Sequence, residues 1–426
     1  MTIRISEELA GPATESATVI GSRVDVALRR EAMTRADWTT HDYNVHFSVG
    51  LQNDGAVDTD ALVSVEGGEW DKLPTRSPLI YGAASPDGPW TPCDFAARTD
   101  LKKRYAIRVP LRSGERRFIA NTLPRRLGDL QLTFDELATR GGARRVIYGK
   151  SLEGRELVAY CYGNSDRATV LVTSGFHPPE PDTLSAEAIM AWLAEDGAGT
   201  VLSQLAVVVV PVVNPDGYAH QTQGSNAAGV NLFWDFRAED ERRCPEAAAL
   251  WRFAADLAPR GYIDFHAYTF QLDKVPGPYC RPLGCYRDKA VREAAQSLYS
   301  QLSTASGSAP VFGFSTYAPA TLGSRLNRRF DTLTVAKYHV HLKEGADGCR
   351  DRGVAVFRGL VETLISRGLT AQSTIAAQSS ALVERSRVWW AGLVRPTLGS
   401  IRRGRFGDIN VRRSGLVLPR VADSRL

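Results

Sequence analysis

The stretch Thr169–Glu180, TVLVTSGFHPPE, decides the fold of this 426-residue sequence. It begins with an unbroken run of apolar and β-branched residues, which predicts a strand buried on both faces. A helix is expected directly afterwards, over Thr183–Leu193. Ligands bind at the carboxyl ends of strands in open α/β sheets, so His177 and Glu180 lie where a site is expected.

A second buried strand also carries a histidine near its end. Residues Tyr262–Tyr268 read YIDFHAY and include His266. Imidazole nitrogen and carboxylate oxygen both suit zinc, although a His-x-x-Glu spacing alone is weak evidence for a metal. Two histidines and one carboxylate leave a fourth coordination position open for water. His177, Glu180 and His266 are therefore candidate ligands for one catalytic zinc ion per chain.

The second half of the chain alternates buried strands with helices. Further strands are expected over 206–213 and 336–342, and further helices over 245–257, 289–302 and 352–364. This order predicts an α/β domain with a mixed, mostly parallel sheet flanked by helices.

The first part of the chain has a different pattern. Short runs of alternating apolar and polar residues, separated by turn residues, predict an N-terminal antiparallel β-sandwich. The predicted organisation is a β-sandwich domain over 1–124, a connecting segment over 125–145, a catalytic domain over 146–369, and a linker with a basic tail over 370–426.

The composition is that of a soluble globular protein, with 43% hydrophobic and 23% charged residues. The first residues, MTIRISEELAGPATES, include acidic residues where a signal peptide needs an apolar core. The longest apolar run, Leu205–Val213, is too short to span a bilayer. The six cysteines form no C-x-x-C pair, which is typical of reduced thiols. We therefore expect a cytoplasmic protein with no membrane partner.

The positive charge is concentrated at the C-terminus. Ten arginines and two acidic residues lie between Arg385 and Arg425, in a chain whose net charge is +5. A basic tail can bind nucleic acid or an anionic surface. The sequence shows no helix-turn-helix pattern or aromatic-plus-basic sheet motif, so nucleic acid is not expected as the main partner.

The sequence from Val146 to Leu369 resembles the zinc carboxypeptidase family in the order and spacing of six short motifs. In chain order they are GKSLEGR (149–155), HPPE (177–180), NPDGY (214–218), GVNL (229–232), PE (245–246) and DFH (264–266). The HPPE form and the β-rich N-terminal region look most like the cytosolic carboxypeptidase branch. The resemblance implies the same three zinc ligands, and hydrolysis of an amide bond in a peptide or peptide-like substrate.

The chain departs from the family pattern at its substrate-binding positions. Where the family reads G-V-D-L-N-R-N-F, residues 229–236 read GVNLFWDF. The Asn-Arg pair that binds a substrate's terminal carboxylate becomes Phe233-Trp234, and an indole cannot replace a bidentate guanidinium. The aspartate that supports a zinc histidine becomes the neutral Asn231. The position where the family has its oxyanion-stabilising arginine is occupied by Gly224 in this chain.

These departures change the expected substrate. Phe233 and Trp234 predict an apolar or aromatic group, or a blocked amide or ester, beside the metal. Arg237 is a further candidate for substrate binding that could supply positive charge from a new direction. Three other arginines are candidates of the same kind, namely Arg325, Arg328 and Arg329.

The general base has two candidates in the stretch YHVHLKEG, residues 338–345. The zinc carboxypeptidase family ends a late strand with a catalytic glutamate. Alignment along the strand places His341 at that position, whereas the Glu-Gly sequence before the following helix favours Glu344 if the alignment shifts slightly. A carboxylate takes a proton from water and returns it to the leaving amine, so we predict Glu344 as the catalytic base. His341 stays open as the base or as a substrate contact.

Other classes of function also remain open. An inactive carboxypeptidase-like protein would bind a peptide without cleaving it. A hydrolase of an ester or a small-molecule amide would use the same metal on another bond. An adaptor for nucleic acid or an anionic surface would act through the basic tail.

Overall fold

The computed structural model describes most of the chain up to residue 371. The described residues are 3–10, 14–34, 40–42, 46–66, 79–95, 97–101, 104–195, 198–236, 241–268, 278–306, 310, 312, 321–341 and 345–371. The statements on structure below concern these residues.

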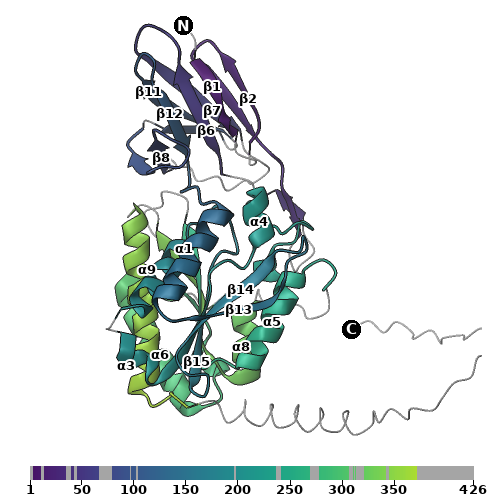
Figure 1. Ribbon diagram of the computed structural model, residues 1–426, viewed down its shortest axis with the longest axis vertical. Helices are drawn as coiled ribbons and strands as arrows, with labels where there is room; N and C mark the ends of the chain where they lie inside the picture. The colour runs from purple at the N-terminus through teal and green to yellow at the C-terminus, as the bar shows by residue number, and fades with distance from the viewer. Residues whose placement is uncertain are drawn as a thin grey trace, which may run out of the picture. The chain divides into compact units, whose positions relative to one another are not determined.

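A seven-stranded sheet forms the centre of the second half of the chain (Figure 1). Its strands in spatial order are β13 (Arg144–Lys150), β14 (Glu156–Tyr162), β16 (Leu205–Val210), β15 (Ala168–Thr173), β17 (Gly261–Tyr268), β19 (Leu333–His341) and β18 (Tyr279–Cys280). The pairs β16/β15, β15/β17 and β17/β19 are parallel, whereas the outer pairs are antiparallel. The predicted mixed sheet is confirmed, with its parallel pairs at the centre.

Helices cover both faces of this sheet (Figure 1). One face packs against α1 (Leu127–Arg140), α2 (Thr183–Leu193), α3 (Gly199–Leu202), α6 (Lys289–Ser306) and α9 (Gly345–Ser366); the other packs against α5 (Pro245–Leu257) and α8 (Leu322–Phe330). Strand β15 shows why its sequence is apolar throughout. Val170 and Val172 pack into the first hydrophobic core, and Leu171 packs into the second. A strand between two helix layers must bury both of its faces.

Two five-stranded sheets form the N-terminal part. The first has the order β1 (Ile3–Ala10), β6 (Ser48–Asn53), β12 (Arg116–Ala120), β8 (Ile80–Ala83) and β9 (Thr91–Cys93); the second has the order β10 (Ala97–Leu101), β11 (Arg104–Leu111), β7 (Thr59–Glu66), β3 (Arg23–Leu28) and β2 (Thr14–Ile20). Val49 from the first sheet and Val63 from the second belong to one buried cluster. Both sheets therefore share a core, as a β-sandwich requires. The pair β3/β7 is parallel, and the other described pairs are antiparallel. A small hairpin, β4 (Ala32–Thr34) with β5 (Thr40–Asp42), follows β3.

Some elements differ from the sequence prediction. The predicted connecting segment contains helix α1, and α9 begins at Gly345 instead of residue 352. Helix α8 was not predicted. Within the described ranges, every helix is too short or too polar to cross a lipid bilayer. The predicted domain boundaries stay predictions.

Candidate metal centre

The turn after β15 brings the first two predicted ligands together. Gly175 has φ +68, and a Cβ there would lie 2.7 Å from the carbonyl oxygen of Pro211, so only glycine fits this position. The backbone N–H of Glu180 then donates to the carbonyl oxygen of His177 at 2.9 Å. This closed turn holds the His177 and Glu180 side chains on the same side.

The third predicted ligand comes from the neighbouring strand. His266 lies in β17, which pairs with β15 in parallel. The Nδ1 atoms of His177 and His266 lie 3.0 and 2.9 Å from the two carboxylate oxygens of Glu180. One ligand atom from each residue lies within 4.8 Å of the others. The structure therefore brings the three predicted ligands together as a group that can hold one metal ion.

The outer nitrogen of each histidine faces an oxygen. His266 Nε2 lies 3.1 Å from Asp264 Oδ2, and His177 Nε2 lies 3.3 Å from Asn231 Oδ1. A proton on each Nε2 satisfies these contacts and leaves the lone pair of each Nδ1 for a metal. The donor set thus fits a zinc ion, with two neutral imidazoles and one carboxylate. The neutral Asn231 still accepts a hydrogen bond where the family has an aspartate.

The two histidines beside Glu180 lower the pKa of its carboxyl. Burial would raise the pKa of its carboxyl, but His177 and His266 hold this pKa well below its usual range. The backbone N–H of Ala267 also donates to Glu180 Oε2 at 3.1 Å. Glu180 is therefore ready to act as an anionic ligand.

Asp264 extends the centre into the sheet. Its Oδ1 accepts a hydrogen bond from Thr173 Oγ1 at 2.9 Å, and Thr173 also contacts the hydroxyl of Tyr262. Burial raises the pKa of the Asp264 carboxyl, while His266 and Lys337 oppose this rise. Asp264 carries no role predicted from the sequence. The alternation of side chains in a strand would have placed it on the same face as His266.

Aromatic rings form a wall beside the histidines. The Phe233 ring meets His266 edge-on at 4.9 Å between centroids, and Phe176 stacks on His266 at 5.9 Å. Phe233 is only 2% exposed, whereas Trp234 is half-buried and packs edge-on against Phe233. The predicted roles of Phe233 and Trp234 in substrate binding stay predictions.

A β-bulge brings a lysine to this wall. Asp264 lies opposite both Ala336 and Lys337, because the β17/β19 register shifts between Ile263 and Phe265. Such bulges change the direction of a side chain. Lys337 Nζ lies 4.8 Å from the centroid of the Phe233 ring, a cation–π contact. Lys337 was not among the predicted site residues, since a bulge leaves no pattern in a single sequence.

Gly224 occupies the place predicted for the missing oxyanion arginine. A Cβ at this position would lie 2.6 Å from Cδ2 of His177. No larger side chain fits while the loop keeps this position. The loss of the arginine is therefore linked to close packing of the backbone against a predicted ligand.

Several predicted site residues lie outside this description. Glu344 and Arg237 are outside the described residues. His341 ends β19 and pairs with Tyr268, but its side chain is not described. The roles predicted for these three residues stay predictions.

The predicted alternative arginines lie on helix α8. The guanidinium of Arg325 stacks on the Trp251 ring at 3.9 Å and donates to the carbonyl oxygen of Phe236. Arg329 lies 5.4 Å from the Phe330 ring. The first contacts place Arg325 in the packing between α5 and α8, whereas Arg329 is exposed on α8.

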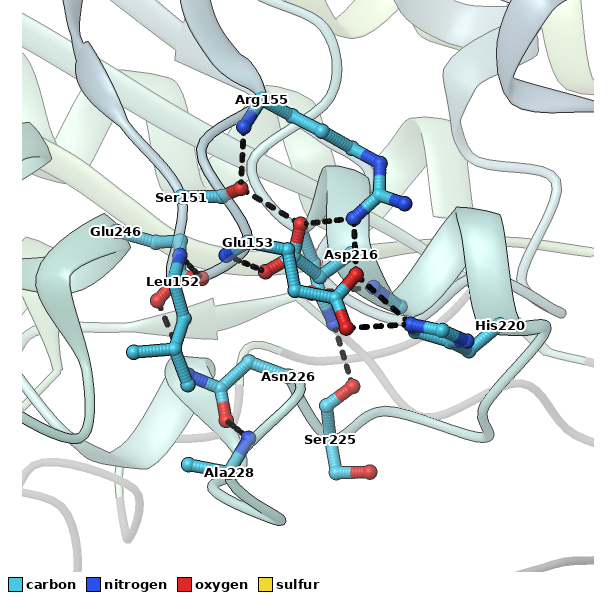
Figure 2. Close-up of polar contacts among 12 residues, drawn as sticks. Ser151, Leu152, Glu153, Arg155, Asp216, His220, Ser225, Asn226, Ala228 and Glu246 are labelled. Carbon is cyan, nitrogen blue, oxygen red and sulfur yellow. Dashed lines mark hydrogen bonds and ion pairs between the residues drawn. The ribbon is translucent and has the colours of Figure 1, made fainter.

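The other motifs form a polar network that supports the loops (Figure 2). Asp216 accepts hydrogen bonds from Ser151 Oγ at 2.6 Å, from Arg155 Nη1 at 2.7 Å and from the backbone N–H of Glu153 at 3.0 Å. Asp216 is fully buried at the start of α4 (Pro215–His220), and Asn214 caps that helix. The GKSLEGR and NPDGY motifs are therefore joined to each other through Asp216.

The comparisons with known proteins agree with this site. Residues 134–309 match the family model for zinc carboxypeptidases, so the matched family is one of zinc-dependent hydrolases. The match contains all three predicted ligands, whereas Glu344 and His341 lie beyond it. The predicted resemblance to the zinc carboxypeptidase family and the predicted zinc cofactor are confirmed.

A curated relative and two solved structures give further detail. "Inactive metallocarboxypeptidase ECM14" of Arthroderma otae is 24% identical over 312 residues, which are 56% of this chain and 51% of that protein. The chain thus spans about half the length of this relative. One similar structure is a metallo-carboxypeptidase from Burkholderia cenocepacia, with a TM-score of 0.69 and 16% identity. Another is a metallo-carboxypeptidase from Pseudomonas aeruginosa in complex with (2-guanidinoethylmercapto)succinic acid, with a TM-score of 0.72 and 15% identity. Each alignment covers 86% of this chain and 100% of the other chain. At these identities the likeness shows the fold.

Proposed function

We propose that this chain is a zinc-dependent hydrolase of an amide bond in a peptide or peptide-like substrate, with a specificity that does not depend on a free terminal carboxylate. The observation that carries the proposal is the convergence of His177, Glu180 and His266, whose ligand atoms lie within 4.8 Å of one another. A zinc ion bound there supplies a Lewis acid that polarises a carbonyl group and lowers the pKa of a water molecule.

The protein's own residues prepare this chemistry. Asp264 and Asn231 hold the two histidines with their Nδ1 atoms directed at Glu180. The buried Phe233 keeps water from one side of the His266 ring. We assign the general base to Glu344, with His341 as the alternative.

The altered specificity follows from two positions. Phe233 stands where the family has the asparagine of its carboxylate-binding pair, and Gly224 leaves no room for the oxyanion arginine. A buried aromatic ring forms no bidentate contact with a carboxylate. An amidated, esterified or otherwise blocked end avoids the cost of placing an unpaired anion beside this wall.

A panel of matched substrates tests the proposal. The zinc-loaded protein is incubated with N-acylated dipeptides that have a free carboxylate, with their C-terminal amides and with the corresponding esters. We expect hydrolysis of the blocked compounds, and loss of this activity in His266→Ala. Efficient trimming of free peptides that disappears when their carboxylate is amidated would contradict the proposed specificity.

An inactive peptide-binding protein is the second candidate. The observation that favours it is the replacement of both anion-binding positions in a chain whose curated relative is named inactive. Stoichiometric zinc binding without hydrolysis of any amide or ester in the panel would support this candidate. Cytoplasmic localisation and an adaptor role of the basic tail remain proposals from the sequence.

A further inference from the structure

The loop between α4 and Asn231 lies directly against the metal centre. Gly224, in the middle of this loop, packs against the ring of His177. Asn231, at its end, faces Nε2 of the same histidine at 3.3 Å. The position of this loop therefore determines the packing on one side of a predicted zinc ligand and one of its hydrogen bonds.

A carboxylate from the N-terminal part of the chain holds this loop. Glu31 Oε1 accepts hydrogen bonds from the backbone N–H groups of Gly224 at 3.2 Å and Ser225 at 3.1 Å, and from Ser225 Oγ at 2.6 Å. Glu31 Oε2 accepts from the backbone N–H of Gln223. Three successive N–H groups thus converge on one carboxylate, the arrangement by which backbone loops bind anions.

Burial makes this contact hard to replace. Glu31 is 8% exposed, so its charge cannot be satisfied by bulk water. Two neighbours add contacts to the same loop from the N-terminal part. His46 Nδ1 lies 3.0 Å from Gln223 Oε1, and Arg29 donates to the carbonyl oxygen of His220 at 3.3 Å.

Residues around the seven-stranded sheet hold the opposite side of the loop. Asn214 Nδ2 donates to the carbonyl oxygen of Ser225 at 3.1 Å, and Asn226 Nδ2 donates to Glu246 Oε2 at 3.0 Å. Figure 2 shows Ser225 and Asn226 beside this network. The loop is therefore fixed between the α/β part of the chain and Glu31. Gly224 donates its N–H to Glu31, and its Cα packs against the ring of His177.

We propose that Glu31 is a positioning residue of the metal centre, through which the N-terminal β-sandwich sets the geometry of His177. The carboxylate holds residues 223–225 so that Gly224 supports the His177 ring and Asn231 orients its Nε2. This role concerns the metal site and does not depend on whether the protein hydrolyses a substrate.

The full-length protein is compared with Glu31→Ala, Glu31→Gln and a matched control, Glu115→Ala. Glu115 is also a carboxylate of the N-terminal sheets that accepts a backbone N–H, from Arg112 at 2.7 Å. Three quantities are measured: hydrogen exchange of the apo protein in peptides containing residues 223–225, zinc affinity by competition with a chromophoric chelator, and the visible absorption spectrum of the cobalt(II)-substituted protein.

In Glu31→Ala we expect faster exchange of these amides, a shifted cobalt spectrum and zinc affinity that is about ten- to a hundredfold weaker, the range typical of lost outer contacts to metal ligands. Glu31→Gln keeps one acceptor oxygen but turns an NH2 group towards the backbone donors, so its effect should be smaller and in the same direction. Glu115→Ala should match the wild type in all three measurements.

A folded Glu31→Ala protein with wild-type zinc affinity and cobalt spectrum would overturn the proposal. If Glu31→Ala does not fold, Glu31→Gln decides, and an unchanged cobalt spectrum in that variant overturns the proposal equally. These readouts involve no substrate, so they can fail while the proposed hydrolase function holds, and the reverse.

Discussion

His266 Nε2 and Asp264 Oδ2 lie 3.1 Å apart on the same face of strand β17. Their separation by two residues makes the strand itself the support of the contact, because side chains two apart point in the same direction. The hydrogen bond fixes the tautomer that leaves His266 Nδ1 free for a metal. Thr173 on the neighbouring strand fixes Asp264 in turn, through a hydrogen bond of 2.9 Å.

Replacement of Asp264 by alanine should weaken zinc binding without removing a ligand. We expect the zinc affinity of Asp264→Ala to fall about ten- to a hundredfold, since outer-shell partners of metal ligands contribute on this scale. Competition with a chromophoric chelator measures it. Asp331→Ala is the matched control, because the buried Asp331 accepts from the backbone N–H groups of Arg287 and Asp288 instead of a histidine. Equal zinc affinities in the two variants would contradict the assigned role.

Gly224 allows a second prediction, in which restoring a family residue should harm the site. An arginine at this position would return the family's oxyanion residue in sequence, but its Cβ would lie 2.6 Å from His177 Cδ2. Both Gly224→Arg and Gly224→Ala should therefore weaken zinc binding, by about tenfold or more. Gly128→Ala, where a Cβ meets nothing within 4 Å, serves as the control for an added methyl group. A gain of hydrolytic activity in Gly224→Arg would show that the loop can move away.

The grouping of the three predicted ligands could be expected from the sequence because each follows a local rule. A continuous apolar strand ends just before His177 and another surrounds His266, and neighbouring parallel strands bring their carboxyl ends together. The order of the motifs then distinguished a metal site from chance spacing. The alternation of side chains in a strand could also have predicted that Asp264 lies on the same face as His266.

Other parts of the structure follow no local rule. Glu31 and Ser225 are 194 positions apart, and no spacing in one sequence relates them. Helix α1 buries Leu130, Phe134 and Ala138 at helical spacing, but Arg126 at its start provides no side-chain cap to mark it. The edge strand β2 is largely half-buried or exposed, so packing imposes little pattern on its sequence.

His46 gives a prediction for the dependence of stability on pH. Burial lowers the pKa of its imidazole, while Gln223 and Glu31 oppose this and Arg29 adds to it. The unfolded chain then binds a proton at higher pH than the folded chain does. The free energy of unfolding should therefore fall as the pH drops below about 6.5, the ordinary pKa of histidine, until His46 also ionises in the folded state.

Urea unfolding at pH 7.5 and pH 5.5 measures this effect in the wild type and in His46→Asn, whose amide can replace the hydrogen bond from Nδ1 to Gln223. We expect the loss of stability between the two pH values to be smaller in His46→Asn, by up to about 1.4 kcal/mol, because pH 5.5 lies about one unit below the ordinary pKa of histidine. His220→Asn, which changes an exposed histidine paired with Glu153, is the control. An unchanged difference in His46→Asn would show that His46 carries no such penalty.

The choice between Glu344 and His341 as the base is decided by separating zinc binding from turnover. A general base contributes typically about a hundred- to ten-thousandfold to the rate, and it is not a metal ligand. Glu344→Gln should therefore lower kcat on the hydrolysed substrate by about this factor while zinc affinity stays at the wild-type value. His341→Ala, with the same measurements, should change KM more than kcat if His341 only contacts the substrate. The reverse pattern, in which kcat collapses in His341→Ala and survives in Glu344→Gln, would assign the base to His341. If kcat is retained in both variants, the proton is taken up by a group other than these two.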